Sequence, residues 1–202
     1  MAQFISVVFH PLLMPSYLFL FIIRYAASLM RPLRMESLLE IWGIIFLVSF
    51  VIPSISIGAL RLTRYITDLS LRERSQRLTP FFFTACFYGL TAYMFYPKLS
   101  VNNLVFLIFA AITALIIIIL IITLFWKISI HGAAIGGVIG FVLAIGMAHP
   151  IAHLHIILAC LVLVAGLVMY ARIASNAHTP FQVYAGALLG LVTCLLAIIK
   201  FF

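Results

Sequence analysis

Long apolar runs separated by short polar segments dominate the chain. The apolar runs cover residues 4–30, 41–60, 81–96, 104–126, 132–147, 156–170 and 180–199. A membrane-spanning helix needs about 20 predominantly apolar residues, and it satisfies all of its backbone hydrogen bonds internally, as a bilayer requires. The pattern therefore predicts an all-α fold, an integral membrane bundle of six to seven transmembrane helices.

The first apolar run differs from the others because it contains His10-Pro11 and then Pro15. Proline removes a backbone donor and kinks or ends a helix. The run is therefore expected either to cross with a kink or to be partly re-entrant. His10 could point into the bundle, but a structural position at the interface is the favoured interpretation.

Composition agrees with a single transmembrane domain over residues 1–202, because 66% of the residues are hydrophobic and only 8% are charged. Within it we distinguish N-terminal spans (1–62), a basic loop (63–80) and a helical core (81–202). The net charge of +8 does not indicate a nucleic-acid partner, since no soluble element carries a basic face. Basic residues that flank membrane helices usually contact lipid head groups.

Carboxylates are scarce, and none follows Glu73. Glycosidases need paired carboxylates, and many lipid-diphosphate enzymes bind magnesium through several aspartates. Both classes are disfavoured, so any chemistry has to use histidine, arginine, serine and backbone amides.

Three polar segments could contribute to such chemistry. The basic loop contains Arg72, Arg74 and Arg77, and on a helix the last two would share one face. Ser129 and His131 precede a ladder of glycines, Gly132, Gly136 and Gly140, whose spacing allows two membrane helices to approach closely. A charged, solvated loop remains the alternative for the arginine segment.

The third segment contains Arg172 and His178, followed by Thr179-Pro180. Thr is a good N-cap and Pro is favoured at the first helical position, so His178 is expected at the N-terminus of a helix, where anions bind well. An ordinary surface loop is the alternative. If all seven segments cross, the three polar segments lie on one membrane face, which favours a common phosphate site.

Another histidine-rich segment, His149, His153 and His155, could bind a metal. No cysteine or carboxylate accompanies it, and Pro150 interrupts regular spacing. We therefore favour an interfacial turn and expect no metal site.

These residues resemble the motifs of the type 2 phosphatidic acid phosphatase superfamily. Arg172, five residues, His178, three residues and Gln182 match the third motif in spacing, although that motif ends in aspartate. The segment 128–131, Ile-Ser-Ile-His, is similar to the Pro-Ser-Gly-His motif without its proline and glycine. The arginines before Pro80 occupy the position of the first motif but lack its lysine.

The resemblance implies a metal-independent, cofactor-free lipid phosphatase acting on a phosphate or diphosphate of a phosphorylated lipid. It makes His178 the nucleophile, His131 the proton donor and Gln182 the residue that orients His178. The phosphate would be held by Arg172, Arg72, Arg74, Arg77, Ser129 and the backbone amide of Gly132. It also implies the bacterial inner membrane, with the site outside the cytoplasm. The number of arginines on the motif-bearing face favours the opposite orientation, with that face in the cytoplasm. When the arginines proposed to bind phosphate are left out, the two faces are nearly balanced.

Gln182 keeps two alternatives open. Its carbonyl can fix the tautomer of His178, but it cannot offer the negative charge that stabilises an imidazolium. The chain could therefore be a slow enzyme, or a non-catalytic relative that binds or transports an anionic lipid. An unrelated secondary transporter is a third possibility, disfavoured because the ionisable residues lie near the span boundaries.

Overall fold

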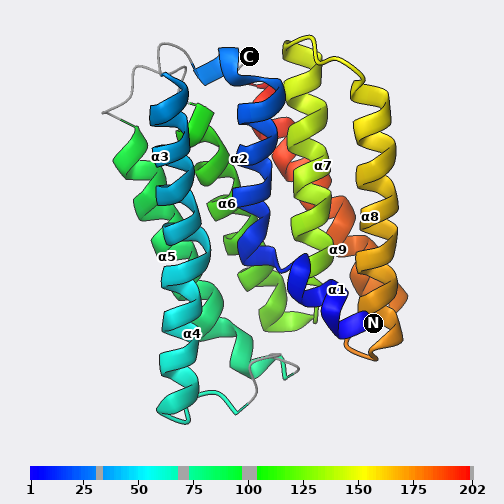
Figure 1. Ribbon diagram of the computed structural model, residues 1–202. Coiled ribbons are helices and arrows are strands. Elements are labelled where there is room, and N and C mark those ends of the chain that lie inside the picture. Colours follow the sequence, from blue (N-terminus) through cyan, green and yellow to red (C-terminus); the bar gives the residue numbers. More distant parts are fainter. Residues whose placement is uncertain (31–33, 68–72, 97–103, 201–202) are drawn as a thin grey trace.

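The computed structural model describes residues 1–30, 34–67, 73–96 and 104–200, and this part of the chain contains helices and no strands. Within these described ranges, seven helical segments are long and apolar enough to cross a membrane. They are Ala2–Tyr25, Glu36–Leu62, Ser75–Phe95, Leu104–Phe125, Ile130–Ala148, Leu154–Ala174 and Pro180–Ile199. The predicted all-α membrane bundle is confirmed (Figure 1).

The individual elements subdivide the first three segments. They are α1 (Ala2–Val8), a 3₁₀ turn (Pro11–Leu13), α2 (Met14–Tyr25), a 3₁₀ turn (Ala27–Met30), α3 (Met35–Phe46), a π-helical turn (Leu47–Val51), α4 (Ile52–Leu62), a 3₁₀ turn (Ser75–Arg77), α5 (Leu78–Phe95), α6 (Leu104–Phe125), α7 (Ile130–Ala148), α8 (Leu154–Ala174) and α9 (Pro180–Ile199). The π turn joins α3 and α4 into one long helix.

The first apolar run is broken rather than merely kinked. Helix α1 ends at Val8, and Pro11, which has no backbone donor, opens a separate turn before α2. Figure 1 shows α1 lying at a steep angle to α2, beside the lower end of α8, and α8 is its main packing partner. None of the residues of α1 is buried. The candidate span Ala2–Tyr25 is therefore broken between α1 and α2, with α1 at one end of the bundle.

Close packing of α7 against α9 holds the centre of the bundle together. A Cβ atom at Gly136 would overlap the carbonyl oxygen of Ala187, and one at Gly190 would overlap that of Ala133. Glycines on both helices thus face the partner's backbone, which is the close approach that the ladder predicts. A backbone hydrogen bond of 3.1 Å from Ser129 N to the Gln182 oxygen ties the beginnings of the two helices together.

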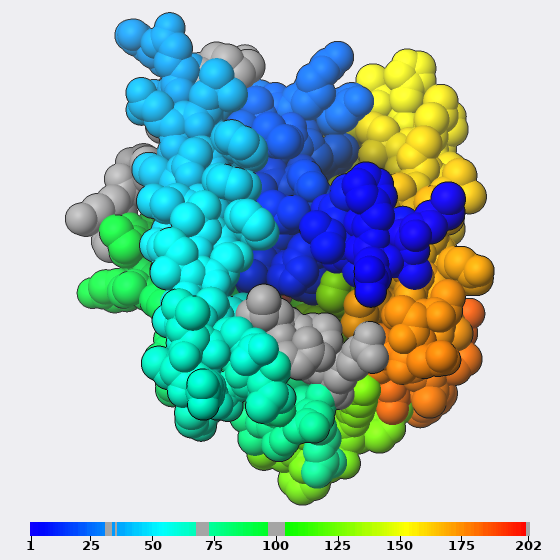
Figure 2. Space-filling model, turned by 60° about the horizontal axis from the view of Figure 1, so that its bottom comes forward, coloured from blue at the N-terminus to red at the C-terminus, as the bar shows by residue number. Residues whose placement is uncertain are grey.

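The three polar segments lie at one end of the bundle. The α4–α5, α6–α7 and α8–α9 connections are all at the bottom of Figure 1, at the same end as the N-terminus. Seen from that end in Figure 2, α1 lies across the face of the molecule against α8. The predicted convergence of the three segments on one face is therefore confirmed.

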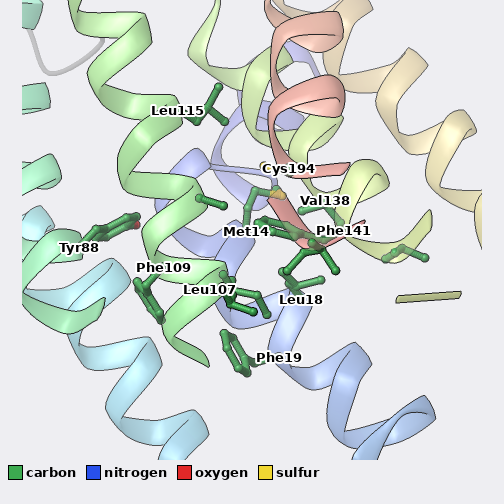
Figure 3. Close-up of a cluster of buried hydrophobic side chains, with 14 of the residues drawn as sticks. Met14, Leu18, Phe19, Tyr88, Leu107, Phe109, Leu115, Val138, Phe141 and Cys194 are labelled. Carbon is green, nitrogen blue, oxygen red and sulfur yellow. The ribbon is translucent and has the colours of Figure 1, made fainter. Parts of the chain in front are cut away.

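Apolar side chains from several helices fill the bundle interior (Figure 3). Phe19 of α2 stacks on Phe109 of α6 with ring centroids 6.2 Å apart, and Tyr88 of α5 meets Phe109 edge-on at 5.5 Å. The buried Tyr88 hydroxyl donates to the Ser49 carbonyl at 2.9 Å, so its polar end is satisfied. This core fixes the helix ends that carry the site.

Candidate functional site

A cavity of about 610 Å³ opens among the helix ends that carry the polar segments. Most of its polar lining residues lie in α1 or within about a turn of a helix end, namely Gln3, Ser6, His10, Arg77, His131, Arg172, Ser175 and His178. The polar residues Ser54, Thr84 and Tyr88 line it along α4 and α5. The apolar lining, including Leu18, Leu115 and Phe141, comes from positions further along the helices. The cavity thus has a polar end at the loops and an apolar part inside the bundle.

His178 is held at the polar end by the N-terminus of α9. Thr179 and Gln182 form a capping box, in which Gln182 Oε1 accepts from the Thr179 backbone N–H at 3.2 Å. The same Oε1 lies 3.1 Å from His178 Nδ1. Because a backbone N–H can only donate, this amide atom is the carbonyl oxygen, and His178 Nδ1–H must donate to it. The lone pair of neutral His178 is therefore on Nε2.

The environment of His178 keeps it neutral. Its side chain is only 7% exposed. Burial is the main cause that lowers its pKa from 6.5 to about 3, the positive charge of Arg77 lowers it further, and the hydrogen bond to Gln182 acts in the opposite direction. At neutral pH the Nε2 lone pair is consequently present in nearly every molecule.

Arg77 lies directly against that lone pair. It ends the 3₁₀ turn before α5 and is 3% exposed. Its Nη1 donates to the Ile128 carbonyl at 3.1 Å, and its Nη2 lies 3.4 Å from His178 Nε2. A buried guanidinium thus donates to the imidazole lone pair at this end of the cavity.

Arg74 of the basic loop does not join Arg77 in the cavity. Arg74 is exposed, its Nη1 donates to the Phe125 carbonyl at 2.7 Å, and it does not line the cavity. Its expected place around a phosphate is therefore wrong, because its guanidinium binds the end of α6 instead. Arg72 lies outside the residues that the structure describes.

His131 and Arg172 meet at one residue of α1. His131, in the first turn of α7, has Nε2 3.2 Å from the Ser6 carbonyl oxygen. Arg172, in the last turn of α8, donates from Nη1 to Ser6 Oγ at 3.3 Å. A carbonyl can only accept, so His131 carries its proton on Nε2. Two of the predicted site residues thus lie in the cavity, where Ser6 is their neighbour.

Ser129 and Gly132 have structural positions instead of the predicted place around a phosphate. Ser129 is fully buried and caps α7, its Oγ accepting from Gly132 N at 3.3 Å. A Cβ at Gly132 would come within 2.6 Å of the Val183 oxygen, so this glycine serves the α7–α9 contact. Neither residue lines the cavity, and the prediction is wrong because capping and packing already use both.

His10 has a structural role, as the sequence favours, because it caps the turn Pro11–Leu13, but it also belongs to the cavity. It lines the cavity, and its ring meets that of His131 edge-on with centroids 5.6 Å apart. Its position follows from the break between α1 and α2, which Pro11 signals. The direction that α1 takes after that break has no signal in the sequence, so Ser6 and Gln3 could not have been identified.

The histidine-rich turn lies at the opposite end of the bundle. His149 Nε2 is 3.1 Å from Ser28 Oγ, and His153 adopts a left-handed conformation before α8. Within the described ranges, no group of three His, Cys, Asp or Glu side chains could hold a metal ion.

Comparison of the chain with protein-family models, with curated proteins and with solved structures finds no match.

Proposed function

We propose that this protein is an integral membrane phosphatase of phosphorylated lipids, a divergent relative of the type 2 phosphatidic acid phosphatases, with His178 as its nucleophile. The observation that carries the proposal is the pair formed by His178 and Arg77. A neutral imidazole presents its lone pair beside a buried guanidinium, inside a cavity that also contains Arg172 and His131.

Arg77 and Arg172 supply the positive charge that a phosphate group needs. Guanidinium groups bind phosphate oxygens through charge-assisted, often bidentate hydrogen bonds. None of the described residues that line the cavity is Asp or Glu, so these residues add no negative charge that would repel a phosphate. The chemistry of the lining therefore favours an anion.

The reaction uses both histidines. Arg77 Nη2 turns from His178 Nε2 to a phosphate oxygen, and His178 Nε2 attacks phosphorus. The bond between phosphorus and the lipid oxygen breaks, and that oxygen takes the Nε2 proton of His131 in its imidazolium form, which leaves neutral His131. Water then attacks the phosphohistidine, giving a proton to His131, and the P–N bond breaks to release phosphate. The Ser6 carbonyl has to move away from His131 Nε2 before the leaving oxygen can take its place.

The apolar part of the cavity supports a lipid substrate rather than a water-soluble ester. Side chains such as Leu18, Leu115 and Phe141 offer no hydrogen-bonding groups and match a hydrocarbon chain. By the same family resemblance we propose the bacterial inner membrane, with the cavity facing away from the cytoplasm.

The test is phosphate release by the detergent-purified protein from a panel of phosphorylated lipids in EDTA. His178→Ala is expected to abolish release, whereas His155→Ala, an exposed histidine at the opposite end, should retain it. Release that survives His178→Ala would contradict the proposal.

A second candidate is a non-catalytic protein that binds or moves an anionic lipid with the same cavity. The neutral Gln182 favours it, because no charge from this residue stabilises an imidazolium at His178. Saturable binding of a phosphorylated lipid, with no release from any member of the panel, would establish this alternative.

A further inference from the structure

We propose that His10 is an additional phosphate-binding residue, which donates a hydrogen bond from Nε2 to the phosphate group. The inference rests on the proposed function, because its ligand is the phosphate bound by Arg77 and Arg172. His10 belongs to none of the three motifs that the chain shares with known phosphatases.

The tautomer of His10 follows from its own turn. His10 caps the turn Pro11–Leu13, and its Nδ1 accepts from the Leu12 backbone N–H at 3.3 Å. A backbone amide can only donate, so Nδ1 carries the lone pair and neutral His10 carries its proton on Nε2. His10 is therefore a hydrogen-bond donor on its other side.

The position of the ring makes this donor useful. His10 lines the cavity and lies edge-on to His131, with ring centroids 5.6 Å apart. The backbone around it is fixed by Pro11 and by the hydrogen bond from Leu13 N to the His10 oxygen at 2.8 Å. None of the hydrogen bonds among the described residues uses His10 Nε2. The His10 ring is thus held at the cavity by the hydrogen bonds of its turn.

The hydrogen-bonding character of the neighbouring groups also fits a phosphate group. Arg77, Arg172 and the His131 Nε2–H are all donors, and His178 Nε2 provides a lone pair. A phosphate group offers several acceptor oxygens and one electrophilic phosphorus. His10 adds a neutral donor to this set, so it can bind a phosphate oxygen without adding to the positive charge of the cavity.

Three substitutions separate binding from the local structural role of His10. His10→Asn keeps an acceptor for the Leu12 N–H, since Asn is a good cap, but it has no donor that reaches as far as Nε2. His10→Gln has a longer side chain with an amide donor, and His10→Ala removes both functions. Arg77→Gln serves as the reference for the proposed phosphate site.

The measurement is the affinity for inorganic phosphate, read from the rise in thermal unfolding midpoint of the detergent-purified protein in EDTA. We expect His10→Asn and His10→Ala to weaken phosphate binding about tenfold, the effect of losing one hydrogen bond to a charged group. His10→Gln should retain more of the affinity. Without phosphate, His10→Asn should unfold at the same temperature as the wild type.

Two results would overturn the inference, and they are distinguishable. If Arg77→Gln weakens binding and His10→Asn does not, the phosphate site stands and His10 only caps its turn. If neither Arg77→Gln nor His10→Asn changes the affinity for phosphate, the proposed site itself fails, and the inference fails with it.

Discussion

Three histidines line the cavity, and a different neighbour fixes the tautomer of each. Gln182 Oε1 accepts a hydrogen bond from His178 Nδ1–H, and the Ser6 carbonyl accepts one from His131 Nε2–H. The Leu12 backbone N–H donates to His10 Nδ1. Three chemically identical side chains therefore differ in whether their Nε2 atom accepts or donates a hydrogen bond. His178 presents a lone pair, while the other two carry their protons on Nε2.

The depressed pKa of His178 predicts how stability depends on pH. The unfolded chain takes up a proton on His178 near pH 6.5, whereas the folded protein resists this until about pH 3. The unfolded state therefore binds more protons between these values, and stability falls as the pH is lowered through that window. The unfolding midpoint of the wild type should fall more steeply over this range than that of His178→Gln. Parallel curves would contradict a buried, neutral His178.

Gln182→Asp tests the effect of the missing negative charge. The carboxylate would stabilise the imidazolium that forms as His178 reacts, and it would raise the pKa of His178 from about 3. We expect turnover to increase about tenfold or more, because in serine proteases the reverse loss of a carboxylate beside the catalytic histidine lowers turnover about 10⁴-fold. Steady-state phosphate release is the measurement, with Gln182→Asn as the neutral control. An Asp variant no faster than the wild type would mean that this charge does not limit the reaction.

The site could be predicted from the sequence only where one short segment determines the geometry. Thr179, Pro180 and Gln182 define a helix start, so the position of His178 at its mouth follows from local rules. The sequence misplaces Ser129 and Arg74 because their partners, the Gly132 amide and the Phe125 carbonyl, satisfy them outside the cavity. His10 depends on the path of α1, which no local pattern encodes.

At the scale of elements, the α7–α9 contact positions the two helix starts from which His131 and His178 project. The repeat of small residues predicts a close approach, but it does not identify the partner helix. In the structure the α7 ladder faces the backbone of Val183, Ala187 and Leu191 in α9, while Gly186 and Gly190 of α9 face the backbone of Ser129 and Ala133. Small residues on both helices thus meet backbone to backbone, and this brings Ser129 within hydrogen-bond distance of Gln182.

Alanine substitutions in this contact should destabilise the protein. At Gly136 the added Cβ would meet the backbone of Ala187, and backbone cannot move aside as a flexible side chain can. We expect a loss of about 1–3 kcal/mol or more, the usual cost of overpacking. Gly166→Ala in α8 is the matched control, because nothing lies within 4 Å of its added Cβ. Equal unfolding midpoints for the two variants would contradict the contact.

At the scale of the whole molecule, seven helical segments bring the three polar connections to one end of the bundle. Span counting predicts this arrangement because each crossing reverses the direction of the chain. The break between α1 and α2 does not disturb the count, since both belong to one candidate span, Ala2–Tyr25. What the count could not reveal is that α1 itself lies over the same end and contributes Ser6 to the cavity.

Cysteine labelling in sealed vesicles tests this topology. The labelling sites are three exposed positions. Two of them, Asn176 and Arg74, lie at the cavity end of the bundle, and His155 lies at the other end; each is replaced by Cys in turn. In a background in which Cys86, Cys160 and Cys194 are replaced, the first two should react with a membrane-impermeant reagent from the same side. His155→Cys should react from the other side. Labelling of Asn176→Cys and Arg74→Cys from opposite sides would contradict the arrangement.

The most direct test of the central claim is to trap the phosphorylated enzyme. The purified protein is mixed with a phosphorylated lipid that it hydrolyses, quenched at alkaline pH to preserve phosphohistidine, and mapped by mass spectrometry. We expect a phosphoryl group on His178 and none in the His178→Ala variant. A phosphoryl group on another residue, or turnover with no phosphorylated histidine in rapidly quenched samples, would contradict it.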